Sequence, residues 1–505
     1  MSGCCIHNAR RFRTMADRDG RNLLDGTLSV LIAEGLFPLT AMISAAYLTR
    51  RLDPADYGTL ILCVSIVVWI QWSITTLFSR ATIKFVRQAD DWRPIGQTVL
   101  RQELLFGVIA AVGLMALAVP VARLLHAPAL VGALGLLAID IPIFCAANAH
   151  QVILVGLGGF RGRAVASAAR WIIRLVLIIV LVEFGFGLHG ALIGLIGASV
   201  AELAVYRCFV RPSLSGREGF PVREMLGYVA PLFVFSMSMR LFDRTDVLML
   251  TLPALGGSMD RAGVFGAAQQ VALLPALFTG AFAPLLLSTL SNQLSNGRPE
   301  AARLIARQGL RVAILLVPIA ALVAALANTT VHVVFGTQFD AAGPLLAVLF
   351  LGSCARVVVG IGATILTAIG RPRLCTWIGL PMWLTLIAAE LVMIPRFGTI
   401  GGAIATTTVA CLGAIVTLLF VDRAWALRPP AGAAVRSAAV SVLVFAVASA
   451  LPDAGLWLLP NYLIGASVIG LAFLGLGEFN PAERSLLRSA LGRLVQPSSL
   501  ASEVV

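Results

Sequence analysis

Residues 102–122 read QELLFGVIAAVGLMALAVPVA, and from Leu104 onward this stretch contains no charged residue. A helix needs about 20 predominantly apolar residues to cross the hydrocarbon core of a bilayer, so the stretch is long enough to span a membrane. The whole chain has the same character. Of its 505 residues 59% are hydrophobic and 12% are charged, whereas soluble domains carry roughly 25% charged residues. The sequence therefore predicts an all-α polytopic membrane protein.

Similar apolar stretches recur along the chain and predict about fourteen transmembrane helices. The connecting loops support this number. When the N-terminus is placed inside, most basic residues outside the spans fall on the cytoplasmic side, as the positive-inside rule requires. The external loops are short, and the longest lies over residues 328–341. We therefore expect both termini to be cytoplasmic.

The net charge of +13 does not indicate nucleic-acid binding. The arginines lie in short runs between apolar segments and form no basic stripe or nucleic-acid motif. The first 22 residues lack an apolar stretch, so they predict a basic cytoplasmic tail and not a signal peptide. The eight cysteines are scattered apart from Cys4 and Cys5, and they form no metal-binding pattern. We expect no metal site and no cofactor.

An internal repeat predicts how the helices are organised. Residues 154–191 align without gaps with residues 366–403, and Trp171 then meets Trp383. Two six-helix bundles that enter the membrane in the same direction form a parallel pseudo-repeat, and carriers built from repeats bind cargo at the repeat interface. The predicted organisation is a basic tail over 1–22, an N-terminal bundle over 23–210, a linker over 211–224, a C-terminal bundle over 225–422, two further helices over 423–477 and a tail over 478–505.

Residues 239–250, MRLFDRTDVLML, place four charges in the seventh predicted span. On a helix, Arg240, Asp243, Arg244 and Asp246 fit within roughly 160° of the circumference. A charge that faces lipid at mid-depth costs at least ~2.5–3.5 kcal/mol, so this face is expected to meet water or other charges. Other ionisable residues at comparable depth are Glu34, Asp140, Arg170, Arg174, Arg356 and Glu390.

Two interpretations of these charges remain open. Internal ion pairs, such as Arg240 with Asp243 and Arg244 with Asp246 or Glu34, would lock helices together. A polar cavity is the second, and we favour it because stability alone gives little reason to bury so many charges. A guanidinium matches phosphate oxygens with two hydrogen bonds, so the arginines indicate an anionic cargo. We predict Arg240, Arg244, Arg174, Arg170 and Arg356 as cargo-binding residues, and Asp243, Asp246, Glu34 and Asp140 as their charge partners or as ion-coupling groups.

Four motifs together resemble a known family. They are RRLDPADYGTLILCVSIV (50–67), FDRTDVLMLTLPALGGSMDRAGVFGAAQQVA (242–272), VVFGTQFDAAGPLLAVLFLG (333–352) and FGTIGGAIATTTVACLGA (397–414). In this order they resemble the Wzx-type polysaccharide flippases of the multidrug/oligosaccharidyl-lipid/polysaccharide (MOP) exporter superfamily, over residues 23–422. Asp243 and Arg244 match the charged seventh span of that family.

The resemblance implies a MATE-like fold, a location in the bacterial inner membrane and a cargo. The family moves undecaprenyl-pyrophosphate-linked oligosaccharide units between leaflets by alternating access through a cationic cavity. Implied partners are this lipid-linked oligosaccharide, membrane lipids and a polysaccharide polymerase or export machinery. Side chains suited to sugar contact are Tyr47, Trp69, Gln71, Trp72, Asn148, Gln269 and Gln270.

Three alternatives remain. A multidrug antiporter of the same superfamily would couple to H⁺ or Na⁺ through Glu34, Asp140 or Asp243. A lipid II flippase has the same number of spans. A membrane glycosyltransferase or polymerase would need a sizeable external loop, which the short loops here do not provide, so we expect no enzyme. The sequence leaves the sugar unit, the polymer and the coupling ion open.

Overall fold

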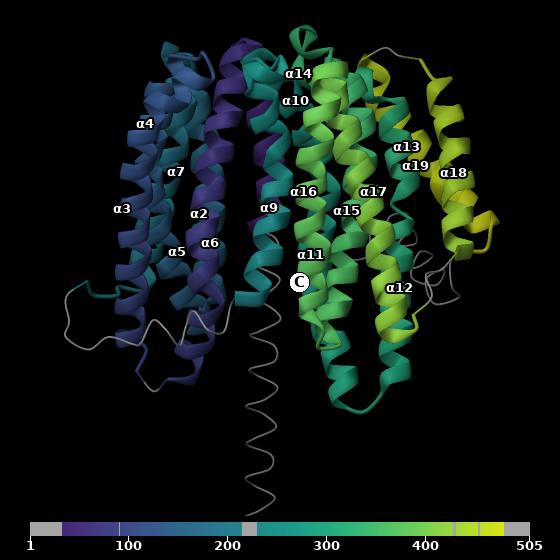
Figure 1. The fold of residues 1–505 in the computed structure, drawn as a ribbon, viewed down its shortest axis with the longest axis horizontal. Coiled ribbons are helices and arrows are strands. Elements are labelled where there is room, and N and C mark those ends of the chain that lie inside the picture. The colour runs from purple at the N-terminus through teal and green to yellow at the C-terminus, as the bar shows by residue number, and fades with distance from the viewer. Residues whose placement is uncertain (1–32, 90, 215–229, 428–430, 453–454, 479–505) are drawn as a thin grey trace, which may run out of the picture.

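The computed structural model describes residues 33–89, 91–214, 230–427, 431–452 and 455–478, which are nearly all helical. Most helices run side by side along one direction (Figure 1). A helix over residues 33–51 comes first. It is followed by α2 (Pro54–Gln88), α3 (Arg93–Leu124), α4 (Ala129–Ala138), α5 (Asp140–Gly156), α6 (Phe160–Leu181), the π-helical turn η1 (Val182–Phe186) and α7 (Gly187–Phe209).

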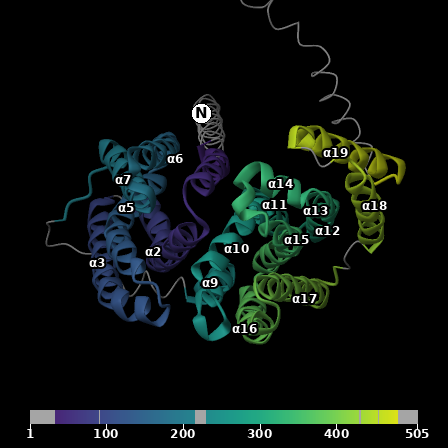
Figure 2. The same cartoon turned by 90° about the horizontal axis from the view of Figure 1, so that it is seen from above.

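A second group of helices lies beside the first (Figures 1 and 2). Two further helices, α18 (Ala431–Ser449) and α19 (Leu458–Gly475), pack at its far side and are joined through η4 (Gly455–Trp457). The second group comprises α9 (Ala230–Thr251), η2 (Pro253–Leu255), α10 (Met259–Ala272), α11 (Leu274–Ser295), α12 (Pro299–Ile314), α13 (Val317–Ala325), α14 (Ala327–Phe335), η3 (Thr337–Phe339), α15 (Ala342–Ala368), α16 (Pro372–Phe397) and α17 (Thr399–Trp425).

Eleven helical segments within the described residues are long and apolar enough to cross a membrane. One of them, Phe160–Phe209, has 50 residues, more than twice the ~20 that a single crossing needs. It contains α6 and α7, which pack against each other as a hairpin. Gly185 and Gly187 have φ angles of 88° and 49°. These are left-handed values that glycine adopts without steric cost, and they allow the chain to reverse there.

The α9 helix is not among the eleven segments, because its four charged residues make it too polar by composition. The expectation of an all-helical membrane fold is confirmed, while the number of about fourteen spans stays a prediction. The boundaries of the two predicted six-helix units also stay a prediction. The predicted tail over 1–22 lies outside the described residues, as do most of the linker over 211–224 and of the tail over 478–505.

Residues 328–341, predicted as an external loop, contain most of the short helix α14 and the turn η3. Val331, Phe335 and Phe339 are fully buried, and α14 packs against α15. The segment connects the candidate spans Pro299–Ala325 and Ala342–Ala368, as predicted, but it contains a short helix whose apolar face is covered by other helices. Its external position stays a prediction.

One continuous apolar core joins the two groups. Near the start of α2, the ring of Tyr57 meets that of Phe339 edge to face at 5.6 Å. The connection into α2 is short, because Asp53 caps the helix by accepting a hydrogen bond from the amide of Asp56 at 2.7 Å and Pro54 occupies the first turn. The α2 helix lies at the boundary between the two groups, where it packs against the charged α9.

Candidate functional site

The charged helix α9 packs against α2 of the first group, and α10 packs against α2 as well. Figure 2 shows these three helices next to one another where the two groups meet. We call this contact between α2 on one side and α9 and α10 on the other the seam. The seam is the place where cations on α9 can meet side chains of the opposite group.

Arg240 and Arg244 both rest on α2. The guanidinium carbon of Arg240 lies 3.6 Å from the ring centroid of Trp72. The Nη1 of Arg244 donates to the hydroxyl of Ser65 at 3.3 Å. Both partners are uncharged, and neither arginine forms an ion pair with any residue that the structure describes.

Asp243 lies on α9 between Arg240 and Arg244, and it pairs with a third arginine. Arg356 of α15 forms an ion pair with Asp243 and also donates to the hydroxyl of Ser353 at 2.9 Å. Asp243 also attracts Arg240 and Arg244 electrostatically. One carboxylate thus faces three guanidiniums, which leaves the cluster Arg240, Asp243, Arg244 and Arg356 with an excess of positive charge.

Asp246 has a different environment, although it lies on the same helix. It is 1% exposed, its Oδ1 accepts a hydrogen bond from Thr406 of α17, and it lies next to the carboxyl group of Glu390 on α16. Glu390 is 0% exposed. Within the described part of the chain, no N–H group or hydroxyl donates a hydrogen bond to either Glu390 oxygen or to Asp246 Oδ2. These two buried carboxyl groups form an acid pair in the second group.

The ionisable residues of the first group are largely neutralised. Arg170 pairs with Glu202 at 2.5 Å, and its guanidinium also lies 4.8 Å from the ring of Phe144. Asp140 accepts a hydrogen bond from Gln71 at 2.8 Å. It also attracts Arg174, whose Nε–H donates to no partner among the described residues.

Glu34 pairs with Arg163 at 3.4 Å and accepts a hydrogen bond from Ser167 at 3.2 Å. The pairs considered from the sequence, Arg240 with Asp243 and Arg244 with Asp246 or Glu34, are not formed as salt bridges within the described ranges. Each of these acids has another partner instead. The structure thus brings Arg240, Arg244, Arg356 and Asp243 together, and it places Arg170, Arg174, Asp140 and Glu34 in the first group.

Two pockets border α10, and the smaller of them also borders α2 and α9. The smaller, of about 110 Å³, is lined by Arg244, Gln269 and Gln270 together with apolar residues of the helix over 33–51. The larger, of about 480 Å³, is lined almost entirely by apolar side chains of α10, α11, α13, α14, α15 and α19. The two share Met42 and Leu274, so the polar pocket opens next to the apolar one.

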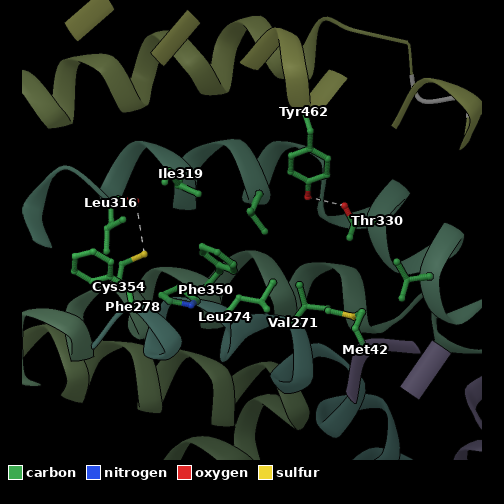
Figure 3. A pocket seen from close by; sticks show the side chains of 13 residues that line it. Met42, Val271, Leu274, Phe278, Leu316, Ile319, Thr330, Phe350, Cys354 and Tyr462 are labelled. Carbon is green, nitrogen blue, oxygen red and sulfur yellow. Dashed lines mark hydrogen bonds between the residues drawn. The ribbon is translucent and has the colours of Figure 1, made fainter. Parts of the chain in front are cut away.

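Figure 3 shows the larger pocket. Its few polar groups are occupied, since Tyr462 and Thr330 hydrogen-bond to each other at 2.8 Å and Cys354 donates to the carbonyl of Leu316 at 3.7 Å. The surface that remains suits a hydrocarbon chain. Its lining consists of Met42, Val271, Leu274, Pro275, Phe278, Leu316, Ile319, Val323, Thr330, Val334, Phe350, Cys354 and Tyr462.

Most of the side chains suggested for sugar contact already have partners. Asn148 donates to Glu103 at 3.0 Å, Tyr47 to Glu183 at 2.8 Å and Gln269 to the carbonyl of Asp243 at 3.1 Å. Only Gln269 and Gln270 of that set line the smaller pocket. Trp72 lies under Arg240. Sequence reasoning missed Glu103 and Glu202, although an acid inside an apolar stretch was the signal that could have found both.

Comparison with known proteins gives two family matches. The polysaccharide biosynthesis protein family matches residues 47–344, which is more than half of the chain. The family of the lipid II flippase MurJ matches residues 262–472.

Relatives and solved structures point the same way. The chain is 23% identical to the succinoglycan biosynthesis transport protein ExoT of Rhizobium meliloti, over 92% of this chain and 93% of the relative. It is 25% identical to the probable flippase AglR of Haloferax volcanii, over 88% and 94%. Its fold is similar to that of the lipid II flippase MurJ in an inward closed conformation, with a TM-score of 0.74 at 13% identity over 89% and 98% of the two chains. It is also similar to an inward-facing MATE family transporter of the MOP superfamily, with a TM-score of 0.68 at 16% identity over 79% and 98%.

Proposed function

Because the chain belongs to the polysaccharide biosynthesis protein family and has the fold of the MOP flippases, we propose that it moves a lipid-linked oligosaccharide across a bacterial inner membrane. The proposed cargo carries its sugars on undecaprenyl pyrophosphate. ExoT, a transport protein of succinoglycan biosynthesis, and AglR, a probable flippase, support a cargo of this class. The proposed role is transport, with no catalytic step.

The observation that carries this proposal is the pair of adjoining pockets. One contains Arg244 with two glutamines, and the other is apolar, and they meet at Met42 and Leu274. A cargo with a charged head group and a hydrocarbon tail would match these two pockets, with its head group in the one that contains Arg244 and its tail in the apolar one. A purely polar sugar would leave the apolar cavity empty, and a purely apolar drug would leave the cations without a partner.

The head-group chemistry favours a phosphate. Arg240 and Arg244 rest on the uncharged groups of Trp72 and Ser65, so each keeps donors for an anion. A guanidinium binds phosphate oxygens with two parallel hydrogen bonds and loses less hydration than an ammonium group does. We therefore assign the pyrophosphate to Arg240 and Arg244. We leave Arg170 and Arg356 in a supporting role, because each is already paired with a carboxylate.

The tail chemistry favours a lipid. Burial of hydrocarbon contributes about 0.8 kcal/mol per CH₂ when it leaves water. Inside a bilayer this gain largely vanishes, because lipid tails are themselves apolar. The cavity of Figure 3 thus guides the tail beside the head-group pocket and adds little binding energy. Most of the selectivity is expected to come from the arginines.

Transport requires the two helix groups to move against each other, and we propose the seam as the boundary of that motion. The arginine-rich loops support a topology with both termini in the cytoplasm. Cargo would then enter from the cytoplasmic leaflet and leave toward a polysaccharide polymerase or export machinery on the other side. The acid pair Asp246–Glu390 is the proposed site of proton coupling, because two adjacent buried carboxyl groups cannot both be ionised at low cost.

Lipid II is a second candidate cargo, because the MurJ family matches residues 262–472. It offers the same undecaprenyl pyrophosphate to the same arginines, so the site accommodates both. A flipping assay in proteoliposomes with the two lipids side by side separates them. Faster flipping of the polysaccharide unit supports the proposed function, and equal or faster flipping of lipid II supports the second candidate.

A further inference from the structure

The seam is built on three successive levels of α2. At Gly58, an added Cβ atom would overlap the carbonyl of Met259, and at Gly263 it would overlap the carbonyl of Pro54. The backbones of α2 and α10 therefore touch at this level, which only glycine permits. About two turns further along α2, Ser65 meets Arg244.

Two more turns along, Trp72 lies under Arg240. The next residue, Ser73, donates to the sulfur of Met237 at 3.3 Å, so the contact between α2 and α9 continues past this level. Trp72 is 39% exposed, and its ring is therefore not a part of the sealed core. An indole that is open on one side and covered by a cation on the other needs an explanation beyond packing.

The stacked geometry has a chemical consequence. A guanidinium that lies over an aromatic face is held by the negative charge density of the ring. Its N–H groups point outward in its own plane and are not used by the contact. Stacking therefore fixes the orientation of Arg240 while leaving its donors free for a planar, two-point contact with an anion. A carboxylate partner would hold the arginine equally well, but it would use those donors and cancel the charge.

We propose that Trp72 is a positioning residue for Arg240, which keeps its guanidinium oriented for an anionic head group and makes that orientation depend on closure of the seam. Trp72 belongs to one helix group and Arg240 to the other. Separation of α2 from α9 removes the ring from the cation, so Arg240 loses its fixed orientation when the seam opens. The seam thus links the affinity for the anion to the arrangement of the two groups.

This proposal rests on the proposed function for the identity of the anion, but the contact itself does not. The natural test therefore has two arms. The first measures the coupling between Trp72 and Arg240 in purified protein without cargo, by the thermal midpoints of W72L, R240Q and the double variant. The second measures binding of undecaprenyl pyrophosphate, with undecaprenol as the lipid that lacks the phosphates. Trp377→Leu is the matched control, because the Trp377 ring on α16 is 69% exposed and is not the ring under Arg240.

The expected result is specific to a cation resting on a ring. In the first arm, W72L and R240Q lower the thermal midpoint non-additively. In the second, W72L weakens binding of undecaprenyl pyrophosphate by roughly tenfold, W72F by less, and W377L has no effect. Binding of undecaprenol does not change in any variant. Additive midpoints, or an equal loss in W72F and W72L, would overturn the proposal.

A shape-preserving series covers the case in which W72L does not fold. Mono-, di- and trifluorinated tryptophans introduced at position 72 keep the size of the indole and remove charge density from its face stepwise. Affinity for undecaprenyl pyrophosphate should fall with each fluorine, whereas a merely structural ring would give a flat series. If the wild-type protein does not distinguish undecaprenyl pyrophosphate from undecaprenol, the proposed function fails. The thermal midpoints of the fluorinated proteins then still test whether Trp72 holds Arg240, because they should fall with each added fluorine if the contact is a cation resting on the ring.

Discussion

The guanidinium of Arg240 on α9 lies 3.6 Å from the ring centroid of Trp72 on α2, so a cation of one helix group rests on an aromatic ring of the other. Four residues further along α9, Arg244 contacts Ser65 of the same partner helix. The remaining arginine of the cluster, Arg356, is instead neutralised by Asp243. Arg240 and Arg244 contact uncharged groups and are therefore expected to bind cargo, whereas the charge of Arg356 is already neutralised by a carboxylate.

Replacement of Arg240 or Arg244, which contact uncharged side chains, should weaken cargo binding. Arg240→Gln or Arg244→Gln should reduce affinity for undecaprenyl pyrophosphate by about tenfold or more, because a hydrogen bond to a charged group contributes ~1.5–3 kcal/mol. Arg244→Lys should recover only part of the loss if two-point contact matters. Isothermal titration in detergent measures the effect, and Arg303→Gln on α12, where Arg303 pairs with the exposed Glu300, is the matched loss of charge. Unchanged affinity in both glutamine variants would remove α9 from the cargo site.

Blocking the junction of the two pockets should impair the lipid tail but not the head group. Leu274 lines both pockets, so Leu274→Trp should slow flipping of the lipid-linked oligosaccharide while inorganic pyrophosphate still binds. Leu384→Trp is the control, because Leu384 is 52% exposed on α16. The comparison uses flipping rates in proteoliposomes. Equal rates in both variants would show that the tail travels elsewhere.

The acid pair should control the response to pH. Asp246 and Glu390 are adjacent and only 1% and 0% exposed. Ionising both would place two negative charges side by side in a buried site, so one of the two carboxyl groups is expected to stay protonated. Glu390→Gln keeps the shape and removes one titrating group, so the folded protein should be at least as stable, while the dependence of flipping on the proton gradient should disappear. Glu300→Gln, on an exposed side chain, is the control. A full response to the gradient in Glu390→Gln would move proton coupling away from this pair.

The pair Arg356–Asp243 should contribute to stability more than to cargo selectivity. Asp243→Asn leaves Arg356 without its counter-charge. The cost should be below the ~3–5 kcal/mol of a fully buried pair, because the Asp243 side chain is 37% exposed. The double variant Asp243→Asn with Arg356→Gln should recover part of the thermal midpoint. If the double variant is as unstable as the sum of the single ones, the two residues do not act as a pair.

The composition of the chain was enough to predict the membrane fold, and the charges on residues 239–250 were enough to predict the helix that carries the candidate site. The partners of those charges were not predictable. Arg356 and Asp243 are 113 residues apart, and Arg170 and Glu202 come from different helices. Periodicity places a residue on a face of its own helix, but the opposing side chain depends on how the helices pack.

The same limit applies to Trp72 and Asp246. Trp72 was suggested as a sugar contact, and only the packing of α2 against α9 reveals the cation over its ring. Asp246 shares a face with Arg240 in the sequence pattern, yet it meets Thr406 and Glu390 on helices that follow more than a hundred residues later. Short apolar helices such as α14 were also missed, because nine residues are too few for a periodic signal.

The most direct test of the account compares binding of undecaprenyl pyrophosphate and undecaprenol to the wild-type protein and to the double variant Arg240→Gln with Arg244→Gln. Binding of the pyrophosphate by Arg240 and Arg244 predicts that the wild-type protein prefers the pyrophosphate lipid by at least about tenfold and that the double variant binds the two lipids equally. A preference of the same size in the double variant, or no preference in the wild-type protein, would contradict it.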